Sequence, residues 1–133
     1  MTEKKYKILA EFISDLSSET KDVETYIFVK DNISKYNLGI DIRSKALKDK
    51  IIEVNTIFKF EDKFENPRKS YFEMTYSTVI KIEEEQKDKK NLEKIILCDV
   101  QNEIYPRMEK AFVNLIDNSG YKGIKFDKKI DFE

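Results

Sequence analysis

Strict alternation of apolar and polar side chains is the sequence feature that most limits how this chain can fold. In residues 35–43, 51–61 and 70–84, every second side chain is apolar over most of the segment. A period of two places alternate side chains on opposite faces of a β-strand, so these segments are predicted strands with one buried face. Residues 6–18 form a fourth predicted strand with apolar residues on both faces. One of its faces is expected to hold Tyr6, Ile8, Ala10 and Phe12, and the other Leu9, Glu11, Ile13 and Asp15.

The segments between the predicted strands differ in length, which bears on the strand order. Residues 44–50 and 62–69 are too short for a parallel return, which needs about a dozen residues or more, so they favour antiparallel neighbours. Residues 17–34 are longer and polar, and they are interpreted as a loop with an apolar island at residues 26–29. The expected sheet is a four-stranded antiparallel meander.

A long helical region is predicted to follow the sheet. Between residues 92 and 118, apolar side chains recur every three or four positions, and Pro106 is expected to kink or break the helix before Gly120 ends it. The fold class is therefore α+β, in a single domain over residues 1–133. One helix and one sheet would leave a face of the first strand and much of the helix uncovered, which predicts oligomerisation or partner binding.

Composition excludes several classes of function. The 25 basic and 26 acidic side chains leave a net charge of −1, so no overall field favours nucleic acid or an anionic membrane. The chain has no histidine and only three glycines, which removes histidine-based triads and metal motifs and any glycine-rich phosphate loop. We therefore expect no enzyme activity, no cofactor and no metal site. No apolar run approaches about 20 residues and the N-terminus has no apolar signal core, which predicts a cytoplasmic protein without membrane insertion.

Apolar and aromatic residues occur where a polar surface would be expected, for example at Tyr26, Phe28 and Tyr36. A protein that binds unfolded or extended polypeptide needs such a surface, with charged residues around it to keep it soluble. The alternative is that these side chains complete the core or a subunit interface. The residues by themselves leave both interpretations open.

Four segments resemble, in the same order, those of the SecB family of bacterial protein-export chaperones. Residues 12–19 (FISDLSSE) are similar to the end of the family's first strand, and residues 27–31 (IFVKD) to its long first connection. Residues 36–42 (YNLGIDI) are similar to its second strand. Residues 102–132 resemble its helix, with an aromatic-proline start, a glycine-aromatic turn and an exit towards a final helix that is missing or truncated here.

The resemblance implies an ATP-independent holdase that binds unfolded preproteins and delivers them to the SecA motor. It also implies a homotetramer built as a dimer of dimers, with the long helices between two sheets. By position, the expected client-binding residues are Tyr26, Phe28, Tyr36, Leu38, Ile40 and Phe132. The expected SecA-binding residues are Asp15, Glu19, Glu73 and Thr75.

Two alternatives to general export remain open. A SecB-like chaperone could serve a single client, such as the antitoxin of a toxin-antitoxin pair. A rival from another class is an oligomeric structural or regulatory domain that has no client.

Overall fold

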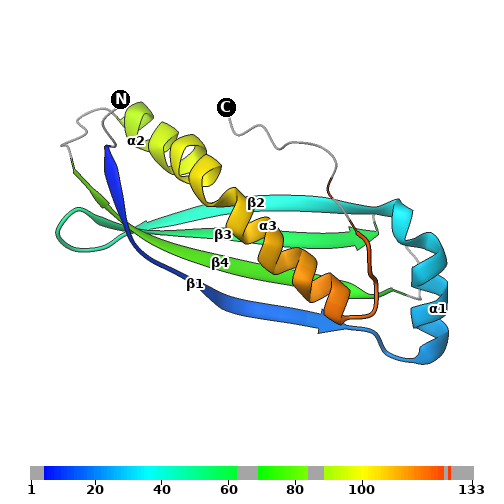
Figure 1. The fold of residues 1–133 in the computed structure, drawn as a ribbon. Coiled ribbons are helices and arrows are strands. Elements are labelled where there is room, and N and C mark those ends of the chain that lie inside the picture. Colours follow the sequence, from blue (N-terminus) through cyan, green and yellow to red (C-terminus); the bar gives the residue numbers. More distant parts are fainter. Residues whose placement is uncertain (1–4, 63–68, 84–88, 125, 127–133) are drawn as a thin grey trace.

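The computed structural model describes residues 5–62, 69–83, 89–124 and 126, which form one antiparallel sheet, a long helical region across one of its faces and a short helix at one end (Figure 1). The strands are β1 (Tyr6–Glu19), β2 (Tyr36–Ala46), β3 (Ile51–Asp62) and β4 (Tyr71–Ile82). Helix α1 (Val23–Asn32) and a 3-10 turn (Ile33–Lys35) lie between β1 and β2, and α2 (Lys89–Lys94), a π-helical turn (Ile95–Asp99) and α3 (Val100–Asn118) follow β4. The predicted α+β class, a four-stranded antiparallel sheet followed by a long helical region, is confirmed. The expectation that the family's final helix is missing or truncated concerns residues outside those described.

The strand order is β1-β4-β3-β2, with every neighbouring pair antiparallel. The two short connections join neighbouring strands, as predicted. The expected meander of all four strands is wrong, because β1 pairs with β4 rather than with β2. The longer connection, with α1 in it, crosses the end of the sheet and carries the chain from one edge to the other (Figure 1). β1 and β2 are consequently the two edge strands.

Helix α1 replaces the predicted loop. The Asp22 side chain caps it by accepting a hydrogen bond from the backbone N–H of Thr25 at 2.8 Å, which satisfies one of the free donors of the first turn. Part of the apolar island faces inward in this helix, where Val29 is buried and Tyr26 is half-buried, whereas Ile27 is 55% exposed. The polar residues around the island had indicated a loop, but they belong to the helix, and Thr25 is itself buried.

Two β-bulges change the faces of β1. The register against β4 shifts after Ile8 and again after Ile13. Each bulge adds one residue to β1 and so reverses which face the following side chains occupy. We call the face under the helical region the inner face and the other the outer face. On the inner face, Glu11, Ile13 and Leu16 lie opposite buried residues of β4. The outer face holds Ala10, Phe12 and Asp15. The two predicted faces of this strand are therefore wrong beyond the first bulge.

The helical region runs without a break through Pro106, so a broken helix at that residue is wrong, whereas the alternative of a kink there stays a prediction. Its irregular turn lies upstream, at residues 95–99, where π-helical hydrogen bonds replace α-helical ones. Pro106 lies on the exposed side of α3, where the carbonyl that loses its partner can reach water. Gly120 ends the helix with a φ of 101°, as predicted.

The buried side of α3 packs on the sheet of its own chain. Its fully buried apolar residues are Val100, Ile104, Met108, Phe112 and Ile116. They join the inner-face core, where the rings of Phe112 and Phe58 meet edge to face with centroids 5.4 Å apart. The expectation that much of the helix lacks cover within one chain is therefore wrong. Uncovered apolar surface does occur on β1, where Leu9, Phe12, Ile13 and Leu16 are each between 43% and 49% exposed.

Candidate functional surfaces

Tyr26 joins α1 to the end of α3. Its ring stacks on that of Tyr121, with 5.0 Å between centroids, and its hydroxyl donates to the Gly120 carbonyl at 2.7 Å. A Cβ atom at position 120 would lie 2.7 Å from the Tyr26 ring, and the positive φ there also favours glycine. This expected client-binding residue thus holds two helices together, and its contact with a client stays a prediction.

Tyr36 is buried among the phenylalanines of β3 and β4, at the start of β2. Its hydroxyl donates to the backbone carbonyl of Ser70 and accepts from the Ser70 N–H, both at 3.0 Å, and burial raises the pKa of the phenol. The Ser70 hydroxyl in turn is hydrogen-bonded to Tyr121 at 2.7 Å and to Thr20 at 2.6 Å. This network closes the end of the sheet next to α1, and Tyr36 presents little surface to any client.

The inner face of the edge strand β2 is only partly covered. Leu38 and Ile40, two expected client-binding residues, are half-buried there, opposite Phe60 and Phe58 of β3. Phe28 of α1 is also half-buried against the core. The structure therefore places three of the predicted residues at the margin of the inner-face core. Another, Phe132, lies outside the described residues.

A groove that the sequence reasoning missed lies between α3 and the segment that follows it. It encloses about 570 Å³ and is lined by Pro106, Glu109, Lys110, Val113, Asn114, Ile124 and Phe126. Phe126 packs against Phe60 and Phe112, with ring centroids 5.6 and 6.2 Å apart, so the chain turns back along the helix after Gly120. The glycine-aromatic pair at residues 120–121 was the sequence signal for this return.

The outer face carries acidic residues close to the α1 end of the sheet. Asp15 pairs directly with Thr75 and Glu19 with Tyr71, and Glu73 lies on the same face of β4 between them. The Tyr71 hydroxyl donates to Glu73, and this bond, with burial and the neighbouring carboxylates, raises the pKa of Tyr71 to about 12. The four expected SecA-binding residues therefore lie together, although their binding to SecA stays a prediction. We call Asp15, Glu19, Glu61 and Glu73 the acidic patch; Glu61 and Tyr71 were missed from the sequence.

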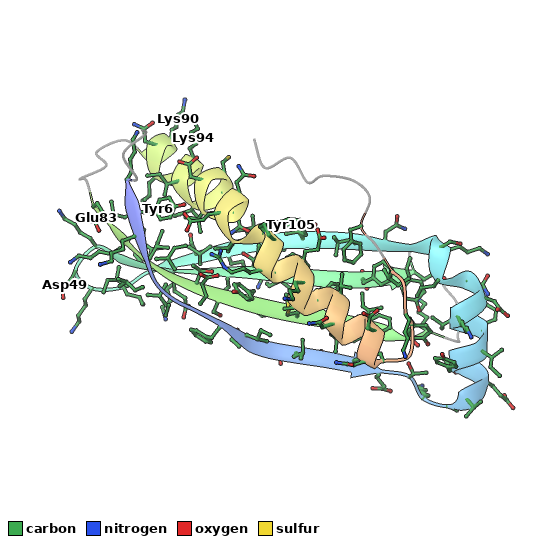
Figure 2. The ribbon with its side chains drawn as sticks, in the orientation of Figure 1. Tyr6, Asp49, Glu83, Lys90, Lys94 and Tyr105 are labelled. Atoms are coloured by element: carbon green, nitrogen blue, oxygen red, sulfur yellow. The ribbon has the colours of Figure 1, made fainter. Side chains whose placement is uncertain are left out.

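A polar clasp ties β1 to α3. Arg107 donates from Nε and Nη2 to the two carboxylate oxygens of Glu11, at 2.8 and 2.9 Å. The Tyr76 hydroxyl also donates to Glu11 at 2.8 Å, and burial together with this bond raises the pKa of Tyr76. Near the start of the strand, where Figure 2 labels it, Tyr6 donates to Glu103 of α3 at 2.7 Å. These partners are far apart in sequence, so no local pattern could have revealed them.

Neither a metal centre nor a membrane span is found in the described part of the chain. Within residues 5–62, 69–83, 89–124 and 126, no three His, Cys, Asp or Glu side chains converge as metal ligands. In those same residues, no helix has both the length and the apolar character needed to cross a bilayer.

Half-buried apolar side chains and a groove beside the helix, with an acidic patch on the opposite face, are features of a protein that binds other polypeptides. A family model described as preprotein translocase subunit SecB matches residues 1–133. The chain belongs to the SecB family. This family consists of chaperones rather than enzymes, and the predicted role as a chaperone in protein export is confirmed.

A curated relative and two solved structures are similar to this chain. A curated protein of Pelagibacter ubique (strain HTCC1062), named as a protein-export protein SecB, is 61% identical over 132 residues, covering 99% of this chain and 94% of that protein. A SecB-like chaperone of Mycobacterium tuberculosis, solved in complex with a ChAD peptide from an antitoxin, is similar with a TM-score of 0.68 and 8% identity. That match covers 94% of this chain and 91% of the other. A protein of unknown function from Streptococcus agalactiae has a TM-score of 0.52 at 8% identity, over 92% and 97% of the two chains. At 8% identity, the two solved structures show the shared fold alone.

Proposed function

We propose that this chain is an ATP-independent holdase, a single SecB-like domain of the cytoplasm that keeps preproteins unfolded before export. The observation that supports this most is the groove beside α3, with the half-buried Leu38 and Ile40 on the neighbouring edge strand. Such a surface binds extended apolar segments with few directional hydrogen bonds, which suits clients of many sequences. Phe28 and Phe132 are proposed to extend it, and Tyr26 and Tyr36 to support it from beneath.

The proposed assembly is a homotetramer built from two dimers. β1 is an edge strand with unpaired backbone groups on one side, and its apolar side chains Phe12, Ile13 and Leu16 are partly exposed. Pairing of β1 with the same strand of a second copy would cover both features. This arrangement also leaves the acidic patch of each sheet accessible.

Hand-over to SecA is proposed to use the acidic patch. Its carboxylates surround the exposed Tyr71 on the outer face, and a cluster of this kind favours a basic partner segment. The patch lies on the outer face, whereas the groove lies on the inner side. A client and SecA could therefore be bound together.

A second candidate is a chaperone dedicated to one client. The similar chaperone of Mycobacterium tuberculosis was solved with an antitoxin peptide, which shows that this fold also serves that kind of client. For the present chain an antitoxin client is the alternative to general preproteins.

Aggregation of a reduced, unfolded model protein tests the proposal. We expect suppression without nucleotide at a near-stoichiometric ratio of chain to client. Failure with every unrelated client, in a preparation whose circular dichroism shows a folded protein, would reject general holding. Suppression only of an antitoxin encoded beside a toxin would favour the dedicated role.

A further inference from the structure

Lysines gather on the outer face at the end of the sheet opposite α1. Lys7 of β1 and Lys81 of β4 are direct partners in the antiparallel register. Their neighbours Tyr6 and Ile82 are buried on the inner face, so both lysines point to the outer face, where both are exposed. Like charges placed directly opposite each other destabilise an antiparallel pair. Folding alone therefore gives no reason for this pairing.

The backbone brings further lysines to the same place. The carbonyl of Lys5 accepts from the N–H of Glu83 at 2.9 Å, and that of Lys50 accepts from the N–H of Ile82 at 3.0 Å. The β2–β3 hairpin that carries Lys50 lies at this end of the molecule (Figure 1), and Figure 2 labels Asp49 and Glu83 there. We call Lys5, Lys7, Lys48, Lys50 and Lys81 the lysine end.

The charge of the lysine end is not neutralised within the described chain. Three carboxylates lie near the five lysines among the described residues: Asp49, Glu83 and Glu53, which is two residues from the β3 partner of Lys81. No ion pair within 4.0 Å joins any of the five lysines to a carboxylate among the described residues. In the acidic patch, by contrast, Lys59 lies 4.0 Å from Glu73. The net charge of −1 therefore conceals two charged regions of opposite sign at opposite ends of one sheet.

We propose that the lysine end is a docking surface for acidic stretches of polypeptide. This inference rests on the proposed holding function, because it adds a second contact for a client whose apolar part occupies the groove. In an extended chain, alternate side chains lie on the same face. Separate, flexible ammonium groups can pair one by one with the carboxylates on that face. Leu9 and Leu47, each 46% exposed at this end, offer apolar contacts between the charges.

An acidic polypeptide fits this surface better than a nucleic acid or a membrane does. Binding of single-stranded nucleic acid uses aromatic side chains among the lysines, and the aromatic ring nearest to Lys7 in sequence, Tyr6, is buried on the other face. The carboxylates of Asp49 and Glu83 interrupt the cluster and would repel a continuous row of phosphates or anionic headgroups. A peptide can adjust its own charges to such an interrupted pattern.

Fluorescence anisotropy of a labelled poly-glutamate peptide tests the proposal, using the full chain at low salt. We expect binding that weakens as salt is added, and a loss of at least about tenfold in affinity when Lys7→Glu and Lys81→Glu are combined. The control Lys21→Glu with Lys35→Glu makes the same change of net charge at exposed positions near α1, and should leave the affinity within about twofold. The variant with Lys7→Arg and Lys81→Arg keeps the charge and should keep the binding.

A second readout separates binding from folding. Lys7→Glu alone converts the like-charge pair with Lys81 into an opposite-charge pair, so the urea midpoint should rise while the affinity for poly-glutamate falls. If Lys7 had a purely structural role, the urea midpoint and the affinity for poly-glutamate would change in the same direction. A lower urea midpoint, no binding by the wild-type chain at low salt, or an equal loss in the control variant would overturn the proposal.

The choice of partner class and the holding function are tested separately. Tighter binding of polyuridylate or of phosphatidylglycerol vesicles than of poly-glutamate would overturn the assignment to polypeptide. Suppression of aggregation of an uncharged apolar client should be the same for Lys7→Glu and wild type. Failure of the wild-type chain to hold any client would reject the holding function, whereas the anisotropy measurement reports on the lysine end alone.

Discussion

The ring of Tyr26 fills the space that any side chain at Gly120 would need. Its Cε1 atom lies 2.7 Å from the position of an added Cβ, and its hydroxyl donates to the Gly120 carbonyl at 2.7 Å. The two residues join α1, which follows the first strand, to the end of α3. This contact fixes the corner from which the segment lining the groove begins.

Gly120→Ala is therefore expected to destabilise the fold by about 2–4 kcal/mol, from the left-handed backbone and the contact with the ring together. Gly123→Ala is a matched control, because Gly123 also has a positive φ but no atom lies within 4 Å of its added Cβ. It should cost only about 1 kcal/mol. Urea unfolding measures both variants. Equal losses at the two positions would show that the ring contact contributes nothing, and a smaller cost of Gly120→Ala in a Tyr26→Ala background would support it.

The clasp between Arg107 and Glu11 should hold the edge strand against the helix. Arg107→Ala is expected to cost about 0.5–1 kcal/mol, because the arginine side chain is 49% exposed and solvent weakens the pair. Lys110→Ala, one turn further along α3, is the control. Amide hydrogen exchange in β1 should increase in the first variant and stay unchanged in the second. Unchanged exchange in both would mean that β4 alone holds β1 in place.

Several parts of the fold could be predicted from the sequence because one local rule determined them. β3 and β4 pair without a bulge, so their buried face follows the alternation throughout and their bounds fall within two residues of those expected. In β1 the two bulges reverse the alternation, and a bulge leaves no mark on a pattern of apolar residues. Asp22 was a usable capping signal for α1, but the polar residues around it favoured a loop.

The strand order and the site depended on contacts that the sequence does not display. Antiparallel hairpins follow from short connections, but a long connection can join either edge of a sheet, so the position of β1 was open. Aromatic residues of α1 and of the start of β2 were predicted to bind clients, yet Tyr36 bonds to Ser70 and is buried. The chemistry of an aromatic side chain is the same in a core as in a binding surface, and only its neighbours decide between them.

Alkaline pH should unfold the protein through its tyrosines. Burial, with a hydrogen bond to Glu103, raises the pKa of Tyr6, and burial also raises the pKa of Tyr36 and Tyr105. A phenol whose pKa is higher in the folded than in the unfolded chain stabilises the fold fully below its unfolded pKa of about 10 and loses that stabilisation as the pH rises further. The contribution of these phenols to the free energy of unfolding should therefore be constant around neutral pH and fall above about pH 10.

Absorbance of tyrosinate and circular dichroism, followed together, check the pH dependence. Part of the tyrosinate signal should appear only as the helical signal is lost. Tyr6→Phe should reduce the fall in stability above about pH 10, because it removes one of these phenols while keeping its ring in place. Titration of all seven tyrosines near pH 10 with the fold intact would contradict the assigned burial.

Leu38→Asp tests the part of the proposed client-binding surface that lies on β2. A charge on the inner face of β2 should weaken client affinity by at least about tenfold, because binding would bury an unpaired carboxylate. Asn37→Asp introduces the same charge on the exposed side of the same strand and should change the affinity by less than about twofold. Sedimentation should show the same assembly for both variants. An unchanged client affinity in a correctly assembled Leu38→Asp variant would show that the client does not contact β2, and Phe28→Asp would then test the α1 side.

Reversing the charge of the acidic patch should separate client holding from delivery. Asp15→Lys combined with Glu19→Lys places two ammonium groups beside Tyr71 on the outer face, so we expect the affinity for SecA to fall by about tenfold or more. Aggregation of an unfolded client should still be suppressed as in wild type, because the groove lies on the inner side of the sheet. Asp31→Lys combined with Glu93→Lys makes the same change of net charge on the helices and serves as the control. If SecA binds all three proteins equally, the outer face has another partner, and pull-down from a cell extract with and without the two β1 substitutions would isolate that partner by difference.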